Sequence, residues 1–237
     1  MLAIWKKEIK SYFYSPMAYV LIGFFLLVSS VLFFVFNLAS GYGDIRWIFI
    51  HWIFILVLIM FVSILTMRIL AEDRKNGTEV LLITSPVSIT SMVIGKFLAA
   101  FSVFLVMTAI TFIYPIITIA YGAPFTVQII GGYIGFILLG GSFISVGVFA
   151  SSLTESQVVA VVISFVSMLL MWIMDAVSSS FGGFISKVLN WFSVLARYED
   201  FYRGILDISS IVYYLSFIAV FLFLTVRVIE KRRWSQG

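Results

Sequence analysis

Six long apolar stretches account for most of this chain, and each is long enough to cross a lipid bilayer as a helix. They cover residues 17–39, 47–67, 97–121, 128–150, 157–174 and 209–229. A helix needs roughly 20 apolar residues to cross a hydrocarbon core about 30 Å thick. Only 11% of the 237 residues are charged, whereas soluble domains are about a quarter charged. The sequence therefore predicts an all-α polytopic membrane protein with six transmembrane helices, in one domain over residues 1–237.

Residues 1–16, ahead of the first stretch, predict an amphipathic interfacial helix. With 100° per residue, one face carries the apolar side chains of Leu2, Trp5, Ile9, Tyr12 and Phe13. Lys7 and Lys10 point away from that face, so the helix should lie in the headgroup plane of the membrane, against the lipids. Ser15-Pro16 then begins the first span, because proline suits the first position of a helix.

The basic residues predict the orientation of the chain in the membrane. Six spans put both termini on one side, and that side carries eleven of the 15 Lys and Arg residues: Lys6, Lys7, Lys10, Arg68, Arg74, Lys75, Lys96, Arg227, Lys231, Arg232 and Arg233. The other side carries Arg46, Lys187, Arg197 and Arg203. The positive-inside rule places the termini and the loop 68–96 in the cytoplasm. Because the cations flank apolar spans instead of forming a patch with aromatic residues, no nucleic-acid partner is expected.

Two features inside the spans predict how helices bend and pack. Tyr114-Pro115 predicts a kink in the third span, because proline lacks an amide donor and its ring crowds the preceding turn. Gly131 and Gly135 in the fourth span have the G-x-x-x-G spacing that allows close helix packing. The sequence leaves open whether the neighbour belongs to the same chain or to a second subunit.

The connections after the fourth and fifth spans carry their own signals. Thr154-Glu155-Ser156-Gln157 has the pattern of a capping box, with Thr154 and Gln157 satisfying backbone amides where the fifth span begins. Residues 175–208 are too long and too apolar for a simple turn in water, so they predict short outer-leaflet helices, an extracytoplasmic gate region, before the sixth span. Asp207 is a candidate cap for that last span.

The residue sets that catalysis requires are missing. His51 is the only histidine and there is no cysteine, so no metal site is expected. No charged residue lies in the middle of the six predicted spans, where ion-coupled transport would require some, and Arg227 lies only near the end of the sixth. An ATP-binding loop is also absent, because Phe97 follows Gly95-Lys96 where Ser or Thr is needed, and Thr90 replaces the first glycine. These absences predict that the chain is no enzyme and that its energy comes from another molecule.

The largest charged segment runs from Arg68 to Glu79, after the second predicted span. Gly77 can take the left-handed conformation that ends a helix, Thr78 can cap the next helix, and Glu79 suits its positive end. The apolar residues 80–83 should then form a short helix. The pattern predicts a compact elbow that offers charges and apolar side chains to a partner. A solvated loop whose leucines lie on the membrane surface is the alternative, and the residues alone leave both open.

This segment resembles the first cytoplasmic loop of ABC-2-type transporter permeases, on the motif RILAEDRKNGTEVLLITSPVS at 68–88 and the following Gly95-Lys96-Phe97. The similarity extends along the chain, through Trp5-Lys6-Lys7-Glu8, Ser15-Pro16 and YEDFYRGILD at 198–207. Within that family the chain most resembles the compact six-span, gliding-motility-associated ABC transporter permease subunits.

The resemblance implies a permease subunit in a bacterial or archaeal cell membrane. Such a subunit pairs with a second permease, identical or homologous, and with two copies of a cytosolic ABC ATPase. That ATPase would bind the ATP and Mg, and this chain would bind no cofactor. The resemblance also implies a cytoplasmic coupling helix whose ATPase-coupling residues are Glu72, Asp73, Arg74, Gly77, Thr78, Glu79 and Leu82, with Lys6, Lys7 and Glu8 beside it.

The expected substrate is hydrophobic or amphipathic, since the middle of each span carries no charge, and export is the expected direction. Polar residues of the second and fifth spans are candidates for the translocation path: Ser63, Thr66, Ser164 and Ser167. Such hydroxyls also commonly bond their own helix. Two alternatives stay open: a membrane anchor that recruits a cytosolic partner without transport, and, more remotely, a membrane enzyme using His51, Glu155 and Asp175.

Overall fold

The computed structural model describes residues 1–39, 51–78, 88–122, 124, 126–178 and 193–235, and these residues form helices and no strand. Six helical segments are long and apolar enough to span a membrane, which confirms the predicted fold class. They consist of α2 (Pro16–Phe33) with the π-helical turn η1 (Phe34–Leu38), α4 (Trp52–Thr66) with α5 (Arg68–Lys75), α7 (Ile89–Thr111) with α8 (Ile113–Ala120), α9 (Val127–Leu153), α10 (Gln157–Ser178) and α13 (Ile208–Ser235). Two short helices, α1 (Leu2–Tyr14) and α12 (Ala196–Tyr202), complete the described fold.

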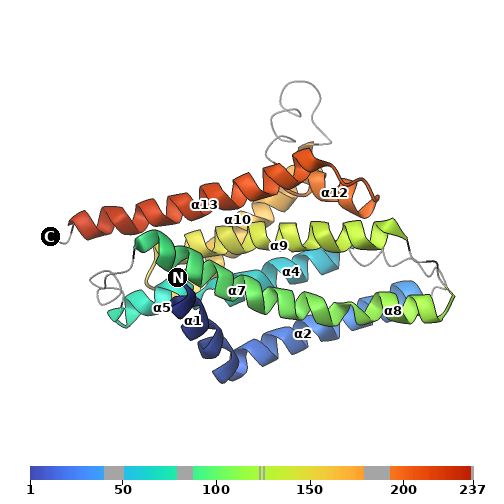
Figure 1. The fold of residues 1–237 in the computed structure, drawn as a ribbon, viewed down its shortest axis with the longest axis horizontal. Coiled ribbons are helices and arrows are strands. Elements are labelled where there is room, and N and C mark those ends of the chain that lie inside the picture. The colour runs from blue at the N-terminus through green and yellow to red at the C-terminus, as the bar shows by residue number, and fades with distance from the viewer. Residues whose placement is uncertain (40–50, 79–87, 123, 125, 179–192, 236–237) are drawn as a thin grey trace.

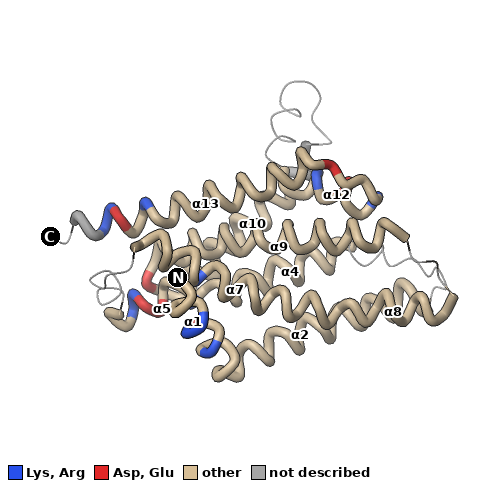
Figure 2. Tube along the Cα trace, viewed as in Figure 1, with Lys and Arg blue, Asp and Glu red and all other residues tan. Residues whose placement is uncertain are grey.

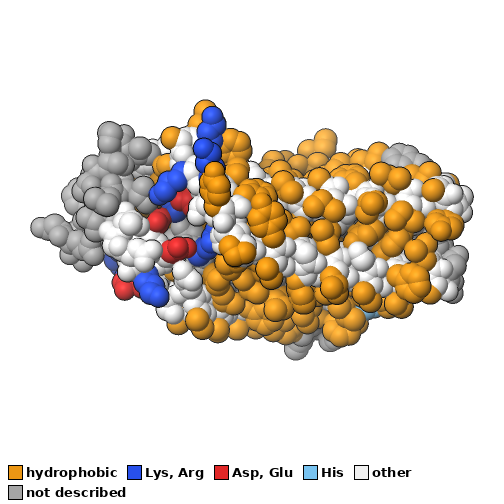
Figure 3. Space-filling model, turned by 90° about the horizontal axis from the view of Figure 1, so that it is seen from below, with side chains coloured by type: hydrophobic (Ala, Val, Ile, Leu, Met, Phe, Trp, Pro, Cys, Tyr) orange, Lys and Arg blue, Asp and Glu red, His pale blue; other side chains and the backbone are white. Residues whose placement is uncertain are grey.

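The spanning helices lie side by side in one bundle, and α9 occupies its centre (Figure 1). Buried residues make up 78% of the most apolar stretch of α9, but only 17% in α10 and in α13. Both termini and α5 lie at the same end of the bundle, and α12 lies toward the other end (Figure 1). Most charged residues lie at the first end and a smaller group lies at α12 (Figure 2), and apolar side chains cover most of the rest of the face seen in Figure 3. The surface thus has the apolar band that a bilayer requires.

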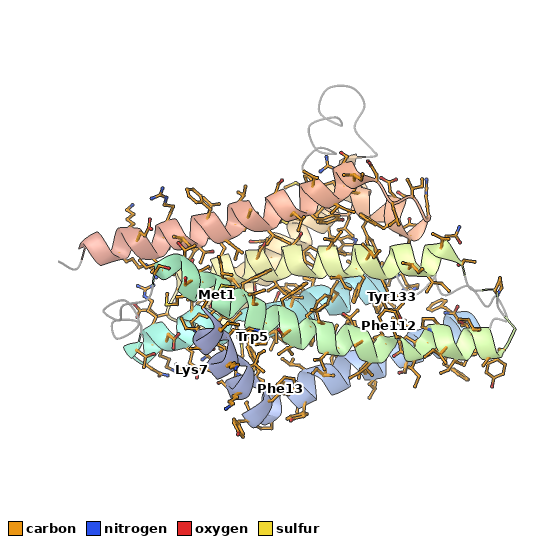
Figure 4. All side chains as sticks on the ribbon, in the orientation of Figure 1. Met1, Trp5, Lys7, Phe13, Phe112 and Tyr133 are labelled. Atoms are coloured by element: carbon orange, nitrogen blue, oxygen red, sulfur yellow. The ribbon has the colours of Figure 1, made fainter. Side chains whose placement is uncertain are left out.

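The third span bends where its proline predicts a bend. The helix is interrupted at Phe112, between α7 and α8. Pro115 has no amide hydrogen for the carbonyl of Thr111 four residues earlier, and the hydroxyl of Tyr133 on α9 donates to that carbonyl at 2.8 Å instead. The rings of Phe112 and Tyr133 stack with centroids 4.0 Å apart (Figure 4). A neighbouring helix therefore satisfies the group that the proline leaves free, and the kink is confirmed.

Small residues on α9 allow its neighbours to approach closely. A Cβ atom added to Gly131 would lie 2.3 Å from the carbonyl oxygen of Phe201, and one added to Gly135 would lie 2.6 Å from the Cβ of Phe201. Phe201 belongs to α12 of the same chain. The G-x-x-x-G pair therefore packs within the subunit, which answers the question that the sequence left open.

We expect Gly131→Ala to lower the free energy of unfolding by about 1–3 kcal/mol, because the new methyl group would displace backbone atoms in a packed contact. Gly23→Ala is the matched control, since a Cβ at Gly23 meets nothing within 4 Å. Alanine is favoured over glycine in a helix, so the control should be neutral or slightly stabilising. Unfolding in mixed micelles measures both variants, and equal stability would contradict the packing described here.

Two predictions about helix starts have different outcomes. Asp207 caps α13, accepting a hydrogen bond from the backbone nitrogen of Ser209 at 3.0 Å, as predicted. The predicted capping box over residues 154–157 is wrong. Helix α10 begins at Gln157, and Thr154 has an extended backbone at the end of α9. Ser156 caps α10 instead, and Thr154 accepts a bond from the nitrogen of Ser156 at 3.1 Å.

Candidate functional site

The candidate coupling site is the charged elbow formed by α5 and the turn after it. Three consecutive residues of α5, Ile69, Leu70 and Ala71, are buried. The helix ends as predicted, because Gly77 follows its C-cap with a φ of 70°, a conformation that favours glycine even though open space surrounds its α-carbon. The hydroxyl of Thr78 turns back to Asp73, 2.9 Å from Oδ1 and 3.1 Å from the backbone oxygen. The predicted next helix, with Glu79 and Leu82, lies outside the described residues.

Side chains from two other helices hold the junction between α4 and α5. Ser151 on α9 donates to the carbonyl of Met67 at 3.0 Å and accepts from the nitrogens of Leu70 and Ala71, each at 3.1 Å. A side chain inserted into the backbone ladder is one of the known causes of a helix bend. Tyr12 on α1 donates to the carbonyl of Leu65 at 2.8 Å. The direction of the elbow is thus fixed by α1 and α9.

The hydroxyl of Tyr12 remains a hydrogen-bond donor because the side chain is buried. Burial raises the pKa of its hydroxyl above the ordinary value, and the nearby guanidinium of Arg68 opposes that shift only in part. The Arg68 guanidinium lies over the Tyr12 ring, 4.4 Å from its centroid. The hydroxyl therefore stays protonated at neutral pH, and α1 keeps its bond to the end of α4.

Lys96 on α7 lies at the centre of the site and is only 2% exposed. Its Nζ atom lies 2.9 Å from Oε1 of Glu8 on α1, 2.5 Å from Oδ2 of Asp73 on α5, and 2.7 Å from the backbone oxygen of Ile69. Two of the three donors of the lysine ammonium bond to Glu8 and to the Ile69 carbonyl, and the Asp73 carboxylate forms an ion pair with it. One buried cation therefore joins three helices.

Lys96 and Ser151 are the residues of the site that sequence reasoning missed, and the reason is clearest for Lys96. The third span was expected to begin at residue 97, but α7 begins at Ile89, so Lys96 lies inside a helix and not in the loop before it. The one sequence signal for Lys96 is the Gly95-Lys96-Phe97 motif. This motif carries part of the family resemblance, but it does not reveal which acceptors bind the lysine ammonium.

Five of the ten predicted coupling residues come together around a polar cleft of about 200 Å³ between α1 and α5. It is lined by Lys7, Glu8, Ser11, Tyr12, Arg68, Ile69, Glu72, Asp73, Asn76 and Thr78. Figure 4 labels Lys7 on α1, beside α5. Lys6 is exposed on α1 and does not line the cleft. The structure thus brings together two segments some sixty residues apart in the chain.

Arg74 faces away from this cleft, toward the turn between α9 and α10. Its guanidinium lies 2.7 Å from the carboxylate of Glu155. Both side chains are partly exposed, at 28% and 61%, so the pair stabilises the fold by no more than about 1 kcal/mol. Close by, Arg232 of α13 donates to the backbone oxygen of Ser152. The α9–α10 turn therefore lies beside the elbow at the charged end of the bundle.

The polar residues predicted for a translocation path lie mostly inside the subunit. Ser63, Thr66 and Ser164 are fully buried, and Ser167 is half-buried. Each hydroxyl donates to a carbonyl of its own helix, the arrangement expected of such residues without a path. None of these contacts tests transport, and the path stays a prediction.

His51 lies at the start of α4, where its contacts are structural. Its Nδ1 accepts a bond from the nitrogen of Ile53 at 3.3 Å and caps α4, and its ring lies 4.4 Å from that of Phe36. Among the residues that the structure describes, no group of three His, Cys, Asp or Glu side chains could hold a metal ion. Asp175, named with it for the enzyme alternative, has no described side-chain position.

Comparison with known proteins agrees with the resemblance seen in the sequence. The family model described as ABC-2 family transporter protein matches residues 4–230. No curated protein matches the chain. The family match includes α1, the elbow and all six spanning helices. The chain therefore belongs to the ABC-2 family of transporter proteins.

Proposed function

We propose that this chain is the permease subunit that couples ATP hydrolysis by a separate cytosolic ABC ATPase to the export of a hydrophobic or amphipathic substrate. Membership of the ABC-2 family supports a permease that works with an ABC ATPase. The observation that carries the coupling role is the elbow, because Lys96, Tyr12 and Ser151 fix the α4–α5 segment to α7, α1 and α9. A segment fixed in this way can pass a displacement on to the spanning helices.

The charge distribution supports the side on which the ATPase would bind. The elbow, both termini and most of the basic residues lie at one end of the bundle (Figure 2), and the positive-inside rule assigns such an end to the cytoplasm of a bacterial or archaeal cell. There two ATPase copies, carrying ATP and Mg, would meet the elbows of two permease subunits. The second permease is either a copy of this chain or a homologue.

The cleft between α1 and α5 supports specific contacts with the ATPase. Lys7, Glu72 and Asn76 line it and offer a cation, a carboxylate and an amide. Glu8 and Asp73 also line it, but the ammonium of Lys96 binds both carboxylates. On this proposal the first three residues contact the ATPase directly, and Glu8 and Asp73 keep the elbow in position.

Substituting Gly77 tests the proposal. We expect the ATPase to co-purify with the wild-type chain, and Gly77→Val to reduce the ATP turnover of the complex about fivefold or more, the low end of typical coupling between sites. Valine strains a backbone with a φ of 70° and so shifts the elbow. Gly122→Val is the matched control, because Gly122 has a φ of 94° with open space around it and follows α8, at the other end of the bundle.

The possible results separate the candidate functions. Unchanged assembly and turnover in Gly77→Val, or equal losses in the control, would count against the coupling role of the elbow. A stable complex that moves no lipid-like substrate in vesicles would favour the membrane anchor. The finer resemblance to gliding-motility-associated permeases extends the proposal to the cell, where deleting the gene in a gliding bacterium should abolish surface movement.

A further inference from the structure

We infer that Lys96 is a positioning residue that locks α1 and α5 into one rigid lever, so that a displacement of the elbow moves the interfacial helix with it. This inference rests on the proposed function, because it concerns how motion enters the permease. It assigns a mechanical role to a residue that lies in neither of the two helices it joins.

The contacts around Lys96 divide the site into two halves. In the first half, α1 is held on α7: the indole nitrogen of Trp5 donates to the hydroxyl of Ser102 at 3.1 Å, and Ile4 packs so closely on Gly95 that an added Cβ would lie 3.3 Å away. In the second half, α5 is held on α9 by the three backbone bonds of Ser151. Each half has its own attachments and does not depend on Lys96.

Lys96 connects these halves with one charge-assisted hydrogen bond and one ion pair. Its stem rises from α7 in the first half, and its ammonium binds Glu8 of that half together with Asp73 and the Ile69 carbonyl of the second. Tyr12 and Arg68 add one hydrogen bond and one cation–π contact between α1 and the α4–α5 segment. Charge-assisted bonds are roughly twice as strong as neutral ones. The lysine is therefore the strongest polar link between α1 and the elbow.

The consequence is a specific uncoupling when that link is lost. Without the ammonium, α1 keeps its contacts with α7 and α5 keeps those with α9, so each helix stays in place in its own half. The two carboxylates, whose side chains are 16% and 18% exposed, would then repel each other across the gap. A push on the elbow would reach α9 but would reach α1 only weakly.

The absence of native cysteine permits a direct test with single fluorescent labels. A bimane label is placed on Lys10→Cys, exposed on α1, or in a separate protein on Lys75→Cys, exposed at the end of α5 and outside the α1–α5 cleft. Each is measured in the complex with the ATPase, without nucleotide and after trapping with ATP and vanadate. In the otherwise wild-type chain we expect both labels to change their emission on trapping.

Substitutions of Lys96 then show whether the lock is responsible. In Lys96→Met we expect the elbow label to respond as before and the α1 response to fall about fivefold or more. Lys96→Arg, which keeps the cation, should retain most of the α1 response. If Lys96→Met fails to fold, the triple variant Lys96→Met with Glu8→Gln and Asp73→Asn removes the lock without leaving unpaired charges, and it should show the same loss.

The outcomes distinguish this inference from the proposed function. An α1 response of full size in Lys96→Met or in the triple variant would overturn the lock, as would a wild-type chain in which only the elbow label responds. If no complex forms, or if neither label responds in the wild-type chain, the proposed function fails and the lock fails with it. A purely structural role would lower the amount of folded complex but leave the ratio of the two responses unchanged.

Discussion

Lys96→Met is expected to lower the free energy of unfolding by about 3–5 kcal/mol, the cost of removing one partner from a buried ion cluster. The ammonium is 2% exposed and lies within 2.9 Å of two carboxylates and a backbone carbonyl. Methionine fills a similar volume but provides no donor, so Glu8 and Asp73 would face each other without a cation. Unfolding of the purified chain in mixed micelles of a mild detergent and dodecyl sulfate measures the loss.

The control for this prediction is Lys10→Met, which removes an exposed cation from α1 at the same end of the bundle. Its effect should stay within about 0.5 kcal/mol, as for most surface substitutions. Adding Glu8→Gln and Asp73→Asn to Lys96→Met should restore part of the stability, because the repulsion between the carboxylates disappears. Equal stabilities of the two single variants would show that the cluster is not formed in the folded chain.

Ser151→Ala is expected to have the second largest effect, a loss of about 2–4 kcal/mol, since an unsatisfied buried polar group costs about 1–3 kcal/mol. The Ser151 hydroxyl bonds the carbonyl of Met67 and the nitrogens of Leu70 and Ala71, and its side chain is 1% exposed. Alanine leaves these backbone groups without their partner where α4 meets α5. The same unfolding measurement applies, and the elbow should also become more accessible to proteases.

Ser152→Ala is the matched control for Ser151→Ala. Ser152 is the next residue of α9, is equally buried, and donates only to the carbonyl of Phe149 in its own helix. Removing that hydroxyl leaves no buried group of another helix unpaired, so the loss should be about 0.5 kcal/mol or less. A similar loss in both serine variants would mean that Ser151 does not bridge the helices.

The fold was predictable from the sequence to the extent that it depends on local signals. Long apolar stretches give the six spans, because each must satisfy its backbone bonds internally in lipid. Pro115 gives the break between α7 and α8, and Gly77 gives the end of α5. Each of these features is determined by residues within about one helical turn.

The centre of the candidate coupling site was not predictable in this way. Lys96 looked like one more cation at the end of a loop, and Ser151 like one of many serines in apolar helices. Their roles depend on partners more than twenty residues away in the chain, Ile69, Asp73 and Glu8 for the lysine and the α4–α5 junction for the serine. Only the packing of α1, α5, α7 and α9 at one end of the bundle brings these groups together.

The central claim is that the elbow faces the cytoplasm and receives the ATPase, and labelling of Asn76→Cys tests it most directly. Asn76 is exposed at the end of α5, and the chain has no other cysteine. A maleimide that cannot cross membranes should label this cysteine in inside-out vesicles and not in intact cells, and bound ATPase should protect it. Labelling from the outside of intact cells would contradict the account.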